Sequence, residues 1–280
     1  MKKSILPILF LSFFLLPRLF AAENLEELGR RMQSSNPAER FQAVRQIAID
    51  YTGQGISFLL QAAEDGDELV RERAIQGLAA AGGMQAVAAA GRALGDSDSF
   101  VRWRAVQALS RLGATDVVEQ LGALVSDQSW RVKVTALELL GTIAGERMKR
   151  TSAEISSKQV IEPIRGYLLS ALEDPDERVR LAAAWSLARN RDGAAYEPLT
   201  TLLKDGSLFV RDEAALALGV LGEMRGAILL VEAMTDPRNT ESEEGRDWAR
   251  WGAVKALIKL TGEDFGLNAD KWNEWIKNNL

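Results

Sequence analysis

The chain has 280 residues, a formal net charge of −5, and 47% hydrophobic and 26% charged residues, which is the composition of a globular protein and excludes a disordered one. It contains no cysteine and no histidine. That absence excludes disulfides, an acylated cysteine anchor, and every metal site or nucleophile that needs a thiolate or an imidazole. We therefore expect no metal and no cofactor.

The first 22 residues have the pattern of a secretory signal peptide. Lys2 and Lys3 give a positive start, residues 5–16 are a nearly unbroken apolar run, and Ala21-Ala22 offers small residues for cleavage. The run is too short to span a bilayer comfortably, although an uncleaved anchor is the alternative. Removing residues 1–22, which hold three basic residues and no acid, changes the net charge from −5 to −8. We therefore expect a periplasmic or secreted protein, with no membrane span in the mature chain.

A second pattern recurs seven times along the remaining chain and is anchored on a basic residue. Successive copies lie 31 residues apart, except for steps of 47 and 39 between the fourth and fifth and between the last two. Relative to the basic residue, alanine always stands at +3, an apolar residue at +4, and leucine or isoleucine at +7. These offsets, with −1, fall on one stripe of a helix, so each copy predicts a helix buried along one side. The basic residues are Arg40, Arg71, Arg102, Lys133, Arg180, Arg211 and Arg250.

Each of these helices is preceded by an acidic turn and by another apolar-periodic segment. Aspartate stands six residues before the basic residue in five copies, where its oxygen suits a turn or helix cap. Pro198 suits a first helical turn, and glycines at 82–83, 113, 193 and 222 suit the left-handed exits of the second helices. The repeating unit is therefore helix, acidic turn, helix, glycine. No stretch alternates with period two, so we expect no sheet.

Two insertions and a final helix depart from the repeat. Residues 145–158 and 237–246 are polar, and we interpret both as solvated loops. Residues 267–280 predict a last helix, with Asn268 as its N-cap and with Trp272, Trp275 and Ile276 on one face. We expect this helix to cover the open end of a repeat domain formed by residues 23–266, rather than to form a binding site.

The Asp-x-x-x-x-Val-Arg-x-x-Ala-x-x-x-Leu pattern resembles HEAT repeats, in particular the short bacterial kind first noted in phycobilisome lyases. The resemblance implies an all-α, right-handed α-α superhelix of about seven helix pairs plus the C-terminal cap helix. It also implies a hydrogen-bonded ladder between adjacent units, in which Lys133 would lack the forked donor geometry of arginine. The ladder would contain Asp65, Arg71, Asp96, Arg102, Asp127, Lys133, Asp174, Arg180, Asp205 and Arg211.

We find no catalytic constellation, and we expect no enzyme activity. The carboxylate pairs recur at the repeat turns, which makes them capping groups, and they do not form a calcium loop. In HEAT-like folds the second helices line the concave face, where offsets +1 and +5 give a stripe with an apolar middle and polar flanks. We interpret it as the binding surface for a protein or peptide; the alternative is packing between neighbouring second helices. The candidate residues are Trp103, Gln107, Val134, Glu138, Leu181, Trp185 and Asp212.

The favoured function is a non-catalytic protein-protein interaction scaffold of the bacterial envelope. A lyase-associated or chaperone-like subunit acting on a larger client protein is the alternative, and the signal segment counts against pigment attachment in the cytosol. A HEAT-like DNA-repair enzyme is disfavoured by export and by the acidic charge, which also makes nucleic acid an unsuitable partner. Neither the identity of the protein partner nor the oligomeric state follows from the sequence.

Overall fold

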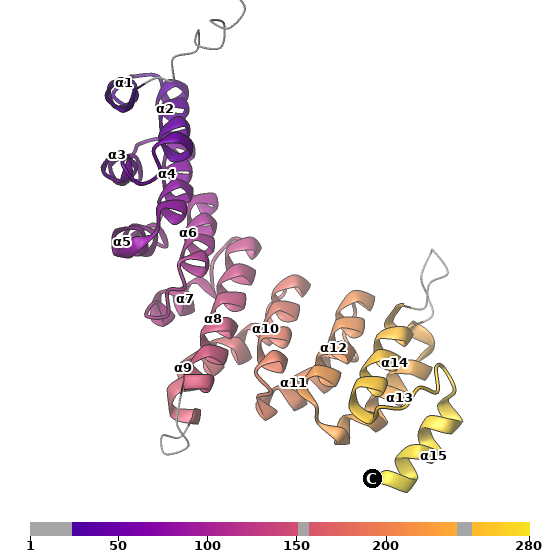
Figure 1. Cartoon of the computed structure of the whole chain (residues 1–280). Helices are drawn as coiled ribbons and strands as arrows, with labels where there is room; N and C mark the ends of the chain where they lie inside the picture. Colours follow the sequence, from indigo (N-terminus) through magenta and orange to yellow (C-terminus); the bar gives the residue numbers. More distant parts are fainter. Residues whose placement is uncertain (1–23, 151–156, 240–247) are drawn as a thin grey trace, which may run out of the picture. The chain divides into compact units, whose positions relative to one another are not determined.

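The computed structural model describes residues 24–150, 157–239 and 248–280, so the expected signal peptide lies outside the described residues. Fifteen α-helices and four short 3-10 helices occur in the described part, which has no β-strand (Figure 1). The fold is therefore all-α, as predicted. None of the helices in these ranges is long and apolar enough to cross a membrane.

The chain forms two compact units, Met1–Ala81 and Gly82–Leu280. Within the first unit, described from residue 24, two helix pairs lie in sequence order, and the second helices pack on each other. The pairs are α1 (Leu25–Arg31) with α2 (Pro37–Asp50), and α3 (Ile56–Ala62) with α4 (Glu68–Ala81).

The second unit contains five further pairs and a last helix in its described residues. Its second helices form a row in which each contacts the next, and each first helix packs on its own second helix. The pairs are α5 (Gly83–Ala93) with α6 (Ser99–Arg111), α7 (Val118–Leu124) with α8 (Trp130–Arg150), α9 (Ser157–Ser170) with α10 (Glu177–Arg189), α11 (Tyr196–Leu202) with α12 (Leu208–Leu221), and α13 (Ala227–Thr235) with α14 (Trp248–Thr261). The last helix, α15 (Ala269–Asn279), packs against α13.

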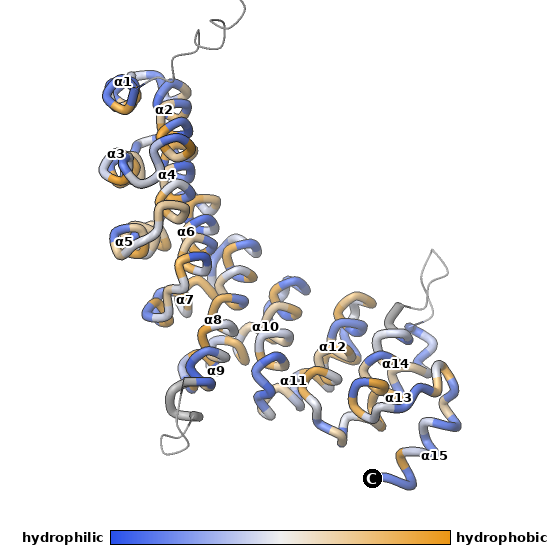
Figure 2. The backbone as a smooth tube through the Cα atoms, viewed as in Figure 1, coloured by the Kyte–Doolittle hydropathy of each residue, from blue (hydrophilic) through white to orange (hydrophobic). Residues whose placement is uncertain are grey.

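The core consists of the helix stripes that the repeat predicts. In the opening copy of the second unit, Val101, Ala105, Val106 and Leu109 are all buried, and the same four offsets are buried in α4, α8, α10 and α12. The alanine at +3 is fully buried in all seven copies, where a larger side chain would force neighbouring helices apart. Hydrophobic and hydrophilic residues accordingly alternate around each helix in Figure 2. The predicted periodicity and its burial are confirmed.

The acidic turns cap the second helices. Oδ1 of Asp98 accepts hydrogen bonds from the backbone amides of Phe100 and Val101 at 2.8 and 3.1 Å. Asp96 in turn accepts from the Asp98 amide at 2.8 Å, which fixes the turn itself. These oxygens satisfy amides that have no partner inside the helix. The predicted capping role of the carboxylate pairs is therefore confirmed in this turn.

The helix exits follow the glycine prediction with one exception. Gly82, Gly83, Gly113 and Gly222 have φ between 65° and 85°, the left-handed region that glycine adopts without strain. The exit of α10 differs, because Arg191 takes the left-handed conformation (φ 50°), while Gly193 begins the 3-10 helix η2 (Gly193–Ala195) behind its N-cap, Asp192. The prediction that Gly193 serves as a helix exit was wrong by two residues.

Replacing Arg191 by glycine is expected to stabilise the second unit by about 1 kcal/mol, because glycine removes the steric cost of a left-handed side chain. Thermal unfolding of the full chain measures the change. Arg189→Gly in the last turn of α10 serves as the control, and it should destabilise by a similar amount, because glycine is unfavourable within a helix. A loss of stability in Arg191→Gly would contradict the assignment.

The first predicted loop is partly helical. Helix α8 continues to Arg150, so residues 145–150 extend the second helix of its pair, while residues 151–156 lie outside the described residues. Nη2 of Arg147 donates to the carbonyl oxygen of Thr115 at 3.0 Å, which ties the extension to the loop before α7. Of the second insertion, residues 237–239 form the 3-10 helix η4, and residues 240–247 are outside the described part.

The last helix has the predicted cap and face. Oδ1 of Asn268 accepts from the backbone amide of Lys271 at 3.0 Å. Trp272 is fully buried, packs edge-on against Phe265, and donates its indole N–H to the carbonyl oxygen of Gly266 at 2.8 Å. Helix α15 contacts α13, the first helix of the last pair, and its role as a cap on the open end of the repeat domain stays a prediction.

Candidate functional site

The acidic turns of neighbouring repeats are joined by arginine–aspartate pairs. Nε and Nη2 of Arg102 donate to the two carboxylate oxygens of Asp127 at 2.7 and 2.9 Å, while Nη1 donates to the carbonyls of Asp96 and Ser97 in its own turn. Arg40 with Asp65 and Arg180 with Asp205 repeat this geometry. Lys133 reaches Asp174 through a single bond of 2.6 Å, because an ammonium cannot form the paired contact.

The pairing with arginine favours the charged form of the Asp127 carboxylate. Burial by itself would raise the pKa of Asp127, but the hydrogen bonds from Arg102 and from the Ser129 amide lower that pKa below its ordinary value. A carboxylate with this environment is a poor proton donor or acceptor near neutral pH. The Arg102–Asp127 contact therefore joins neighbouring repeats.

Arg211 differs from the other basic residues of the ladder in its hydrogen-bond partner. Arg211 also bonds to the following repeat, but its Nε donates to Oδ1 of the Asn239 amide at 2.6 Å and its Nη2 to the carbonyl of Arg238 at 2.9 Å. Asp236, which lies 25 residues after Arg211, as in the other pairs, is held instead by Arg238. The insertion in the last repeat thus replaces the carboxylate with a neutral amide.

Arg71 and Asp96 each form hydrogen bonds within their own turn. Nη1 of Arg71 donates to the backbone carbonyls of Asp65 and Gly66, at 2.9 and 3.2 Å, in the turn before α4. The Asp96 carboxylate supports the turn before α6, as described above.

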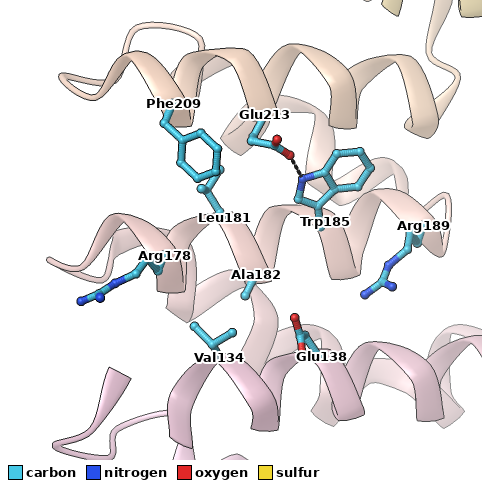
Figure 3. Close-up of a pocket in the computed structure, with 9 residues that line it drawn as sticks. All are labelled: Val134, Glu138, Arg178, Leu181, Ala182, Trp185, Arg189, Phe209 and Glu213. Carbon is cyan, nitrogen blue, oxygen red and sulfur yellow. Dashed lines mark hydrogen bonds between the residues drawn. The ribbon is translucent and has the colours of Figure 1, made fainter. Parts of the chain in front are cut away.

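A hollow of about 360 Å³ lies on the second-helix surface between α8, α10 and α12 (Figure 3). Four of the candidate partner-binding residues line it, namely Val134, Glu138, Leu181 and Trp185. Counted from the basic residue of each repeat, residues at +1 and +5 of one second helix here lie opposite residues at −2 and +2 of the next second helix. The other lining residues are Arg178, Ala182, Arg189, Phe209 and Glu213.

The four candidates contribute differently to this hollow. Leu181 is only 6% exposed, so it forms part of the wall, as in the alternative in which the stripe packs between helices. Val134 and Trp185 are half-buried, and Glu138 is exposed. The indole N–H of Trp185 donates to Oε2 of Glu213, which fixes the ring of α10 against α12. Packing and exposure therefore both occur along the predicted stripe.

Trp103 and Gln107 lie on α6 and do not line this hollow. Both are half-buried. The Trp103 and Phe100 rings lie 5.0 Å apart, and the guanidinium of Arg104 lies 4.8 Å from the Trp103 centroid while Nη1 donates to Gln107. These side chains form a separate aromatic and cationic cluster on the same row of helices.

Asp212 was expected at the polar edge of the binding surface, but it does not line this hollow. Its carboxylate lies against Gly252 of α14, where a Cβ atom on that glycine would fall 1.8 Å from Oδ1. Oδ1 is buried and has no hydrogen-bond partner among the described residues. Burial, followed by repulsion from Glu213, raises the pKa of Asp212 to about 6. The neighbouring residue, Glu213, lines the hollow in its place.

Five of the lining residues were not predicted from the sequence, namely Arg178, Ala182, Arg189, Phe209 and Glu213. The signal was present, because offsets −2, +2, +5 and +9 also lie on one side of a helix. Arg178 is held by Asp176, at 2.9 Å from Nε to Oδ1, and its guanidinium lies 3.7 Å from the ring centroid of Trp130. Hydrogen bonds from Arg178 accordingly lower the pKa of Asp176. Among described residues, neither Glu138 nor Arg189 has a side-chain hydrogen bond or ion pair.

No group of three or more metal-binding side chains occurs in the described part of the chain.

The helix contacts and the hollow together define a class of protein. It is a solenoid of stacked helix pairs with a partly apolar, charge-lined hollow on its second helices. Sequence comparison agrees with the repeat fold. HEAT repeats match residues 56–141, 94–155 and 167–244, more than half of the chain, and the protein belongs to the HEAT repeat family.

Several solved structures are similar to this chain at low sequence identity. An engineered protein is 20% identical, with 91% of this chain and 71% of that chain covered and a TM-score of 0.53. The complex of CpcE and CpcF of phycocyanin lyase from a Nostoc species is 21% identical, with 92% and 95% covered and a TM-score of 0.45. A designed armadillo repeat protein is 21% identical, with 85% and 100% covered and a TM-score of 0.47. No curated protein matches the chain. These likenesses concern the fold alone.

Proposed function

We propose that this protein is a non-catalytic interaction scaffold, and that the hollow between α8, α10 and α12 binds a segment of a protein partner. The observation that carries the proposal is the exposure of apolar side chains around a hollow with charged edges. Phe209 at its edge is 53% exposed, and Trp185 is half-buried within it. An aromatic surface with a polar rim is typical of protein-binding sites.

The same row of second helices carries further exposed aromatic side chains in the second unit. Phe100 on α6 and Trp251 on α14 are 42% and 47% exposed. A binding segment longer than the hollow would find further apolar contacts along this row. The turn carboxylates support a scaffold rather than an enzyme, because they are occupied as helix caps and as ladder partners.

Photocrosslinking tests where a partner binds. A photoreactive phenylalanine analogue at Phe209 should trap a protein partner in cells, whereas the same analogue at Ile228 should not. Ile228 is a matched control, because it is 50% exposed and lies on α13, a first helix outside the second-helix row. Equal trapping from both positions, or trapping from Ile228 alone, would contradict the proposed binding surface.

We also propose that the protein acts in the bacterial envelope, supported by the basic, apolar and small-residue pattern of residues 1–22. The native protein should then be recovered from the periplasmic or secreted fraction, with a mature N-terminus close to Glu23. N-terminal sequencing and cell fractionation measure both features. Recovery of the intact chain from the cytoplasm would contradict this location.

A further inference from the structure

Two carboxylates border Trp185 from opposite sides. Glu213 comes from α12 and accepts the indole N–H, while Glu138 comes from α8 on the other side of α10 (Figure 3). The indole is a neutral donor, so the hydrogen bond orients the Glu213 carboxylate without neutralising its charge. Glu138 is exposed and has no side-chain partner among the described residues. The centre of the hollow therefore presents an aromatic ring between two uncompensated negative charges.

The two cations in the lining do not balance these charges equally. Arg178 is compensated by Asp176 in its own turn and lies over Trp130, and Figure 3 shows it directed away from Trp185. Arg189, one helical turn after Trp185, is exposed and lies at the far edge of the hollow. The carboxylates thus outnumber the uncompensated guanidinium, and a positively charged group has the better electrostatic fit.

The walls suit the stem of a long basic side chain. Val134, Leu181, Ala182 and Phe209 supply apolar surface around the charged centre. Lysine and arginine bury their methylene stems along such surface while the charged head meets carboxylates, and a cation over a tryptophan face is further stabilised by the ring. An acidic side chain in the same place would meet two like charges.

We propose that this hollow receives a lysine or arginine side chain of the bound protein segment, with Trp185 as the aromatic surface and Glu138 and Glu213 as the charge partners. The proposal rests on the proposed function, because it names the chemistry of the partner that the scaffold binds. It assigns Arg189 no attractive role.

Three synthetic peptides of twelve residues test the proposal by isothermal titration calorimetry with the full chain. They share their leucine and serine positions and carry lysine, glutamine or glutamate at the remaining three. The lysine peptide should bind at least tenfold more tightly than the glutamine peptide at low salt, and the glutamate peptide should bind most weakly. The preference should shrink at high salt, because screening weakens charge pairing.

Charge-removing variants locate the effect. Glu138→Gln and Glu213→Gln should each lower the affinity for the lysine peptide several-fold. Both variants should fold, because glutamine at position 213 still offers an oxygen to the Trp185 indole and because Glu138 is exposed. Glu232→Gln on α13 is the matched control, with the same change of net charge outside the second-helix row, and it should leave the affinity unchanged. Arg189→Gln should leave the affinity unchanged or raise it.

The outcomes separate this proposal from the scaffold function. Equal affinity for the three peptides, tighter binding of the glutamate peptide, or an equal effect of the Glu232 control would overturn the basic side-chain proposal. If no peptide binds while Phe209 still traps a partner, the proposal also fails but the scaffold function stands. If neither peptide binding nor trapping occurs, both fail.

Discussion

Replacing Gly219 by alanine is expected to destabilise the second unit by about 2–3 kcal/mol, one of the two largest stability effects we predict. A Cβ atom at Gly219 of α12 would lie 2.7 Å from the Cα atom and 2.8 Å from the Cβ atom of Ala256 on α14. Backbone atoms cannot rotate away as a long side chain can, so the two helices would have to separate. Chemical denaturation of the full chain, followed by circular dichroism, measures the loss.

Gly166→Ala is the matched control for this prediction. Gly166 lies inside α9, and a Cβ atom there would meet nothing within 4 Å. Alanine is favoured over glycine within a helix by about 1 kcal/mol, so the control should be slightly more stable than the parent chain. Similar behaviour of the two variants would show that close helix contact at Gly219 is not what requires the glycine.

Asp212→Asn is expected to stabilise the second unit above pH 6 by about 1–2 kcal/mol, because Asp212 is only partly buried and solvent screens part of the penalty on its charge. The folded chain raises the pKa of Asp212 to about 6, chiefly through burial and then through repulsion from Glu213, while Lys255 and the Gly252 amide act in the opposite direction. Folding therefore favours the protonated carboxyl. Asparagine removes the cost of holding a buried charge near Gly252.

The stability difference between Asp212→Asn and the parent chain should depend on pH. At low pH, below the ordinary pKa of 3.8, Asp212 is protonated in both the folded and the unfolded chain and contributes no penalty. The penalty develops between pH 3.8 and about 6, so the stability advantage of Asp212→Asn should grow through that window and stay constant above it. Unfolding midpoints at pH 4 and pH 8 measure the difference. An advantage that is larger at pH 4 would contradict the raised pKa.

The fold could be predicted from the sequence because its signals are local and repeated. One alanine at +3 is weak evidence, but seven copies with the same apolar offsets define the buried stripe, and all seven alanines are buried. The capping aspartates could be predicted for the same reason, because a cap contacts amides only two or three residues away. Helix α8 ran past its predicted end because residues 146–150 favour helix despite their polarity.

The candidate site was only partly predictable, because it depends on how neighbouring helices are rotated against each other. Asp212 and Glu213 are adjacent in sequence, yet one faces Gly252 and the other faces the hollow. Periodicity defines a helix side to within about one residue, and that uncertainty exchanges these two carboxylates. Leu181 is likewise buried in a hollow that it lines together with Phe209 and Glu213 of the next repeat, and no single repeat encodes that arrangement.

The ladder also shows where this architecture tolerates added length. Arginine and aspartate partners lie 25 residues apart at Arg40, Arg102 and Arg180, whereas Lys133 and Asp174 lie 41 apart, and the contact still forms at 2.6 Å. The additional sixteen residues in this repeat therefore do not prevent the two turns from making contact. The junction between α8 and α9 is therefore where we expect a tag, a fluorophore or a foreign domain to be accepted while the row of second helices is kept.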